Sequence, residues 1–168
     1  MLIRNKLMIS SLVACAFLAS SAATAKPMKN GKFGVGLSTS GAFGSFGLSA
    51  KKELTNELTA EATVGFLGTY TNFGGKVMYK FQKDAKYDIY GYGSLGYWSY
   101  DYGSRYYYDG HYYAKTTGVG FGAGAGIEYD VTKDITVNGE LGFNVVNWDY
   151  GYTGMGGVNL GIAAHYWF

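Results

Sequence analysis

Apolar residues alternate with polar or small residues at a period of two along most of the chain after residue 32. The clearest segment is 57–66, in which Leu58, Ala60, Ala62, Val64 and Phe66 share one face and polar residues or glycine occupy the other. A β-strand separates side chains in this way and a helix does not. Eight such segments are predicted: 33–38, 46–51, 57–66, 76–81, one starting near 87, one ending near 129, 135–145 and 157–168. The pattern predicts an all-β fold.

The last segment carries apolar residues to the end of the chain. Its apolar face consists of Val158, Leu160, Ile162, Ala164, Tyr166 and Phe168. Chain ends are usually solvated, so an aromatic end indicates anchoring. A strand of about 9–11 residues with alternating apolar side chains is typical of a transmembrane β-barrel. We therefore expect an eight-stranded antiparallel up-and-down transmembrane β-barrel at residues 26–168.

If the apolar faces meet lipid, the opposite faces enclose a lumen with charges of both signs. The expected inward charges are Lys51, Glu57, Glu61, Lys76, Lys80, Glu128 and Glu140. They suit an ion path or a catalytic carboxylate pair, or ion pairs that fill an interior with room only for its own side chains. We favour the filled interior. Pairing Val64 with Val77 predicts a salt bridge between Glu61 and Lys80.

Alternate glycines from Gly118 to Gly126 face the expected interior of the sixth strand. They suit a narrow channel or leave room for bulky neighbours, because barrel interiors often alternate small and large residues. We expect inward tyrosines of an adjacent strand to occupy this space. The strict period of two and the lack of a following helix argue against a phosphate-binding loop.

The fifth and sixth strands form an unusually long hairpin. Asp109-Gly110 between aromatic runs is a strong turn signal, and each arm is about twice the length that a membrane requires. The residues expected to form a surface interaction site are Tyr106, Tyr107, Tyr108, His111, Tyr112 and Tyr113. Tyrosine combines large contact area with a hydroxyl, which suits recognition. Cross-strand pairs or an aromatic girdle at the membrane surface are the alternative.

The side-chain directions in the fifth strand conflict with a simple turn. The expected outward residues are Ile89, Leu95 and Tyr97. A two-residue turn at Asp109-Gly110 pairs odd-numbered residues of one strand with even-numbered residues of the other. The expected outward residues of both strands have odd numbers, so odd residues would have to pair with odd ones. A bulge or a wider turn must intervene, and the directions of Tyr90 and Tyr92 remain open.

The connections provide an orientation. Those after the second, fourth and sixth strands are expected to be short and charged, and those after the third, fifth and seventh longer and aromatic. This asymmetry is typical of periplasmic turns and outer loops. An even strand number then places both termini in the periplasm.

Residues 1–25 have the pattern of a cleavable signal peptide. Arg4 and Lys6 precede an apolar run, and Ala23-Thr24-Ala25 supplies a small-x-small cleavage site. The run is too short for a transmembrane helix. Lipidation at Cys15 after cleavage of a lipoprotein signal is the alternative.

Composition narrows the classes of function. Removal of residues 1–25 leaves twelve basic and twelve acidic residues and no cysteine. A neutral chain without a basic cluster does not indicate a nucleic-acid partner, and disulfides or thiolate metal sites are not expected. Pro27, the single proline, precedes the first strand.

Catalytic candidates are scarce. Ser104, Asp109 and His111 lie close together in sequence, but only at one hairpin apex, and His165 belongs to the last strand. Nucleophilic catalysis needs a preorganised set of such groups. We expect no catalytic residues, no metal and no cofactor, so a lipid-modifying enzyme is a remote alternative.

The alternating strands, mixed inward charges, protruding hairpin and terminal Tyr166-Trp167-Phe168 resemble the small outer-membrane barrels related to the membrane domain of outer membrane protein A and to outer membrane protein X. The Tyr166 and Phe168 pair resembles the C-terminal signal read by the outer-membrane insertion machinery. No His-x-Ser sequence resembles that of barrel-type lipid A deacylases.

The resemblance implies a monomer in the outer membrane of a Gram-negative-type bacterium, in contact with lipid and lipopolysaccharide. It implies a structural or adhesion-like surface role, with a small porin-like channel as the alternative. A wall-tethering role is not expected, because the sequence carries no peptidoglycan-binding domain.

Overall fold

The computed structural model describes the backbone of residues 33–40, 45–67, 71–108, 111–149 and 153–168. It describes the side chains of residues 33–39, 46–66, 71–100, 116–149 and 156–168. The expected signal peptide and Cys15 lie outside these residues. The strands are β1 (Phe33–Ser40), β2 (Ser45–Glu53), β3 (Leu58–Leu67), β4 (Thr71–Lys83), β5 (Tyr87–Tyr108), β6 (His111–Asp130), β7 (Ile135–Trp148) and β8 (Thr153–Trp167).

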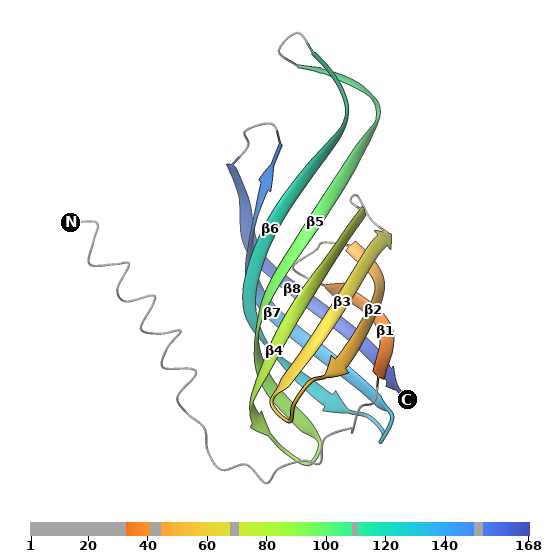
Figure 1. Ribbon diagram of the computed structural model, residues 1–168, viewed down its shortest axis with the longest axis vertical. Helices are drawn as coiled ribbons and strands as arrows, with labels where there is room; N and C mark the ends of the chain where they lie inside the picture. Colours follow the sequence, from red (N-terminus) through yellow and green to blue (C-terminus); the bar gives the residue numbers. More distant parts are fainter. Residues whose placement is uncertain (1–32, 41–44, 68–70, 109–110, 150–152) are drawn as a thin grey trace, which may run out of the picture.

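The eight strands form a closed barrel in which each strand pairs with its sequence neighbours (Figure 1). All pairs are antiparallel, and β1 closes the barrel against β8 from Gly34–Trp167 to Thr39–Ile162. Closure leaves no edge along this seam, as a barrel requires. The predicted all-β fold and its eight-stranded up-and-down topology are confirmed.

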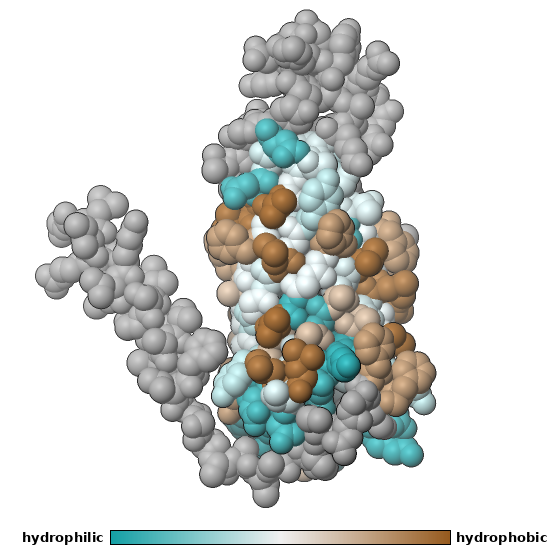
Figure 2. Space-filling view, in the orientation of Figure 1, coloured by the Kyte–Doolittle hydropathy of each residue, from teal (hydrophilic) through white to brown (hydrophobic). Residues whose placement is uncertain are grey.

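The period of two sorts the side chains between the two surfaces of the barrel wall. Exposed large apolar residues lie on the outside of all eight strands, and range from Phe46 at 37% to Val158 and Leu160 at 77%. Figure 2 shows brown, hydrophobic residues over much of the height of the visible wall. The buried positions are mostly polar or charged. The sheet is therefore apolar outside and polar inside, the reverse of a water-soluble barrel.

The expected difference in connection length was wrong. β3 ends at Leu67 and β4 begins at Thr71, so this connection is no longer than the one from Glu53 to Leu58. The asymmetry lies in the strands: β5 has 22 residues and β6 has 20, whereas β1 has 8. In Figure 1, β5 and β6 rise well above the other strands. Strand pairing continues where loops were expected.

The expected irregularity of the long hairpin is confirmed. From Tyr87–Tyr129 to Asp101–Lys115 the register pairs odd residues with odd ones, and a shift follows before Tyr106–Tyr113. Leu95 is 63% exposed, as predicted, while Tyr90 and Tyr92 are buried inside the barrel. The bulge thus reconciles a tight turn with the outward apolar face.

Two turns at the end away from the hairpin share one design. The backbone N–H groups of Leu54 and Thr55 donate to the carbonyl of Leu58, and those of Val131 and Thr132 donate to that of Ile135. In each turn the threonine hydroxyl accepts two backbone N–H bonds. The residues over 53–59 and 130–136 match in type except at Asn56 and Lys133, a similarity visible in the sequence.

Candidate functional site: the barrel interior and the hairpin

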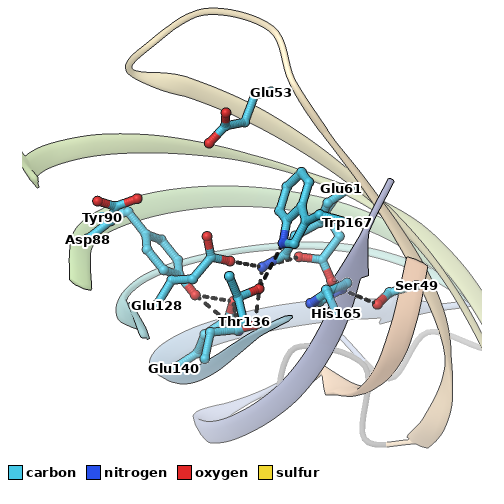
Figure 3. Close-up of polar contacts among 12 residues, drawn as sticks. Ser49, Glu53, Glu61, Asp88, Tyr90, Glu128, Thr136, Glu140, His165 and Trp167 are labelled. Carbon is cyan, nitrogen blue, oxygen red and sulfur yellow. Dashed lines mark hydrogen bonds and ion pairs between the residues drawn. The ribbon is translucent and has the colours of Figure 1, made fainter. Parts of the chain in front are cut away.

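The interior contains three lysines and five carboxylates, each at most 8% exposed. They alternate with lipid-side residues along β2 to β7, so the strand period carries them inward. The group consists of Lys51, Lys76, Lys80, Glu53, Glu61, Asp88, Glu128 and Glu140. Sequence reasoning missed Glu53 and Asp88, although their positions in the alternation could have indicated them. Figure 3 shows members of this group directed toward one another.

Lys76 and Lys51 connect strands across the interior. The Nζ of Lys76 lies 2.5 Å from Oε1 of Glu140 and 3.1 Å from Oε2 of Glu61. The Nζ of Lys51 lies 2.6 Å from Oε2 of Glu128 and 3.9 Å from Oε2 of Glu61. A buried charge is tolerated when it is paired and hydrogen-bonded, so these contacts account for charge at the centre of the barrel.

The predicted salt bridge between Glu61 and Lys80 was wrong. Val64 pairs with Phe73 and not with Val77, which places Glu61 opposite Lys76. The ammonium group of Lys80 instead lies 2.6 Å from Glu53 and 3.1 Å from Asp88. Sliding a strand by an even number of residues keeps every side chain on its face. The apolar pattern therefore could not select this register.

Glu57 does not face the interior, contrary to expectation. It is exposed in the turn before β3, where its Oε2 lies 3.3 Å from the hydroxyl of Thr55. The strand begins only at Leu58, so the period of two does not extend to Glu57. The other six predicted inward charges are buried.

Tyr90 and Tyr92 of β5 fill the space beside the glycines, as predicted. A Cβ at Gly126 would lie 2.6 Å from the Tyr90 ring, and one at Gly124 would lie 2.7 Å from the Tyr92 hydroxyl. The Tyr90 hydroxyl donates to Glu140 at 2.7 Å and accepts from Asn138 at 3.2 Å. Glycine is needed here because a Cβ would collide with these tyrosine side chains and with backbone atoms of β7. The tyrosine side chains therefore lie against β6 inside the barrel.

The C-terminal strand contributes two further buried groups. The indole N–H of Trp167 donates to Thr136 at 3.0 Å, and Nε2 of His165 lies 2.6 Å from the Ser49 hydroxyl. His165 Nδ1 has no hydrogen-bond partner among the described residues. Ser49 and His165 are 4% and 1% exposed, so this pair is buried inside the barrel.

The proposed insertion signal faces outward. Tyr166 and Phe168 are exposed, and their rings pack edge to face with centroids 5.1 Å apart. Recognition by the insertion machinery stays a prediction.

The hairpin site is described only at the backbone. Tyr106–Tyr113, Tyr107–Tyr112 and Tyr108–His111 are strand pairs. Their side chains, the side chain of Ser104 and the turn at Asp109-Gly110 lie outside the described residues. Pairing of β4 with β5 stops at Thr71–Ser99, and that of β6 with β7 stops at Gly118–Trp148. Beyond these rows, among the described strands, β5 and β6 pair only with each other.

The described ranges contain no group of three His, Asp, Glu or Cys residues that could hold a metal ion. The same part of the chain has no helix long and apolar enough to cross a membrane. Several interior residues bond to one another between strands, as in Lys51–Glu128 and Lys76–Glu140. Other buried groups, such as the hydroxyls of Thr63 and Tyr92, have no hydrogen-bond partner among the described residues.

A closed eight-stranded antiparallel barrel with an apolar exterior and a charged interior has the fold of the small outer-membrane β-barrels. The N-terminal β-barrel domain of Pseudomonas aeruginosa OprF superposes with a TM-score of 0.56, at 13% sequence identity, over 82% of this chain and 98% of that chain. Neisserial surface protein A matches over 82% of this chain and 94% of its own at 16% identity, with a TM-score of 0.42. No protein-family model and no curated protein sequence matches the chain. The likeness to OprF shows the fold.

Proposed function

We propose that the protein is a monomeric outer-membrane β-barrel with a structural and cell-surface interaction role, performed through the β5–β6 hairpin. Its termini lie in the periplasm, and it acts neither as an enzyme nor as an open channel. Its partners are the lipid and lipopolysaccharide around the wall, the insertion machinery at Tyr166 and Phe168, and a ligand at the hairpin.

The outer surface supports the membrane location. Large apolar side chains stay exposed around the whole barrel, and many, such as Leu141 at 56% and Phe121 at 60%, are more than half exposed. Such a surface costs free energy in water and is stable against hydrocarbon. In Figure 1 the C-terminus and the start of β1 lie at the end opposite the hairpin. This arrangement supports periplasmic termini and an outward hairpin.

The hairpin's length is the observation that carries the proposed surface role. About 9–11 residues cross a membrane, whereas β5 has 22 residues and β6 has 20. The hairpin is paired beyond Ser99 and Gly118, so it projects as a two-stranded ribbon. Its sequence there is rich in tyrosine, which suits adaptable binding.

The filled interior supports a surface role over the channel and enzyme alternatives. Lys76 bonds to Glu140 across the lumen, and Tyr90 and Asn138 donate to the same carboxylate oxygen. An ion would have to break buried pairs to pass, and a substrate would have no route to Ser49 or His165.

A replacement of residues 106–113 by a short Gly-Ser turn tests the surface role. Host cells carrying each form would be tested for aggregation and for adhesion to collagen, fibronectin and mucin. We expect at least a tenfold loss of adhesion with unchanged heat-dependent gel mobility. The matched control places the same Gly-Ser turn at residues 84–86, at the opposite rim, and should adhere normally. Equal adhesion of all forms to every surface would refute the proposed role.

A further inference from the structure

A groove of about 770 Å³ is bordered by residues of β3 to β6. Its apolar side-chain lining consists of Ala60, Phe73, Val77, Leu95, Tyr97 and Val119. All except Ala60 and Tyr97 are more than half exposed, which places the groove on the outer surface of the wall. Glu61 and Lys76 also border the groove, but their side chains are 0% and 1% exposed, so they give it no accessible charge. The groove is therefore an apolar hollow in the surface that faces lipid.

Gly75 and Gly93 form the floor of the groove. Gly75 pairs with Ala62 and Leu95, and Gly93 pairs with Val77 and Ala123. All of these positions point outward. Because Gly75, Gly93, Ala62 and Ala123 have small or no side chains, they leave a depression in the outer surface. Beside the floor, the rings of Phe73 and Tyr97 pack with centroids 5.3 Å apart.

These two glycines differ from the glycines inside the barrel. A Cβ at Gly93 would meet nothing within 4 Å, and one at Gly75 would meet only the Glu61 carbonyl at 3.8 Å. At Gly124 and Gly126, by contrast, a Cβ would collide with a tyrosine. Glycine weakens a strand interior. Neither close packing nor a positive φ requires glycine at positions 75 and 93. The visible consequence of glycine at these positions is that the groove stays open.

We propose that this groove binds a hydrocarbon chain of one membrane lipid. The proposal rests on the membrane location given under Proposed function. The volume lies within the range of about 300–1,000 Å³ found for small-molecule sites. The groove is continuous with the apolar wall that would meet acyl chains, and its lack of accessible charge favours a chain over a headgroup.

A lipid chain fits better than a second barrel. In lipid, one apolar wall gains no hydrophobic free energy by leaving acyl chains for another apolar wall. A flexible acyl chain can enter a groove between Phe73 and Val119. The rigid wall of a second barrel would contact mainly the edges of the groove.

The test is native mass spectrometry of the refolded mature protein released from detergent containing dipalmitoyl phosphatidylethanolamine. We expect one retained lipid per barrel, and equal retention of the phosphatidylglycerol with the same chains. Gly75→Leu and Gly93→Leu should together lower the bound fraction at least tenfold. Gly139→Leu is the matched control, because a Cβ there also meets nothing within 4 Å but lies outside the groove.

A second variant tests the site by another route. Phe73→Ala removes part of the wall without filling the groove, and should lower retention by about threefold or more. Heat-dependent gel mobility shows whether each variant is folded, and each single glycine variant can replace the double one if needed. Equal lipid retention by wild type and all variants, or no retention by wild type, would overturn the groove assignment.

Two further outcomes also decide. A dimer lost in the glycine variants, without lipid loss, would assign the groove to a second copy. Failure of the wild type to insert into lipid vesicles would refute the membrane location itself, whereas insertion without retained lipid would refute only the groove.

Discussion

The ammonium of Lys76 and the carboxylate of Glu140 lie 2.5 Å apart, although their strands β4 and β7 are not neighbours in the barrel. The contact therefore crosses the lumen. Tyr90 from β5 bonds to the same Glu140 oxygen at 2.7 Å. One carboxylate thus joins three strands, and this joining explains how a polar interior can be both filled and stable.

Breaking this contact from one side should destabilise the barrel strongly. Lys76→Met leaves the buried Glu140 carboxylate without its ammonium partner, which costs about 3–5 kcal/mol. Glu140→Gln should cost less, because Lys76 keeps Glu61 at 3.1 Å. The double variant should lose less than the sum of the two. Urea unfolding in lipid vesicles, followed by gel mobility, measures these values. Glu57→Gln in the exposed turn is the control and should change stability by less than about 0.5 kcal/mol. Additive losses for Lys76 and Glu140 would contradict the pairing.

The β3–β4 register makes a separate prediction about Glu61. A double-mutant cycle of Glu61→Gln with Lys76→Met should give a coupling energy of about 0.5–3 kcal/mol. The cycle with Lys80→Met should be close to additive, because Lys80 bonds to Glu53 and Asp88. The same unfolding assay serves for both cycles. The reverse ranking would mean that Val64 pairs with Val77 after all.

The contact of Tyr92 in β5 with Gly142 in β7 makes a further prediction. A Cβ at Gly142 would collide with the Tyr92 hydroxyl and lie 2.9 Å from the Ala123 carbonyl. Gly142→Ala should therefore cost about 1–3 kcal/mol, and Tyr92→Phe in the same chain should recover part of the loss. Gly139→Ala, which adds a methyl group in open space on the same strand, should be neutral or stabilising. A Gly142→Ala barrel as stable as wild type would show that Tyr92 does not contact Gly142.

The two matching turns offer an internal comparison. Thr59 and Thr136 occupy equivalent buried positions, but only Thr136 accepts the Trp167 N–H, while the Thr59 hydroxyl has no partner among the described residues. Thr136→Val should cost about 1–3 kcal/mol, because it removes the hydrogen bond that the buried indole N–H of Trp167 donates. Thr59→Val should cost little or stabilise. Thermal unfolding monitored by Trp fluorescence would compare them, and equal effects would argue against the Trp167 bond.

The sequence was enough to predict the strands and their faces, because alternation such as that of Leu58 to Phe66 reports which side chains share a face. It was not enough to predict contacts across strands. A shift of the β3–β4 register from Val64–Val77 to Val64–Phe73 changes no face but exchanges the partner of Glu61. Nor does alternation mark where a turn begins, which explains the error at Glu57. The inward direction of Tyr90 and Tyr92 depends on the register shift between Asp101 and Tyr106, which alternation alone does not predict.

The most direct test of the filled barrel is conductance of the refolded mature protein in a planar bilayer, with heat-dependent gel mobility showing that the barrel is folded. The interior bonds of Lys76, Lys51 and Tyr90 predict a folded and silent barrel. Reproducible single-channel steps that change with Lys76→Met or Glu140→Gln would contradict this prediction, because they would show a hydrated path along the same residues.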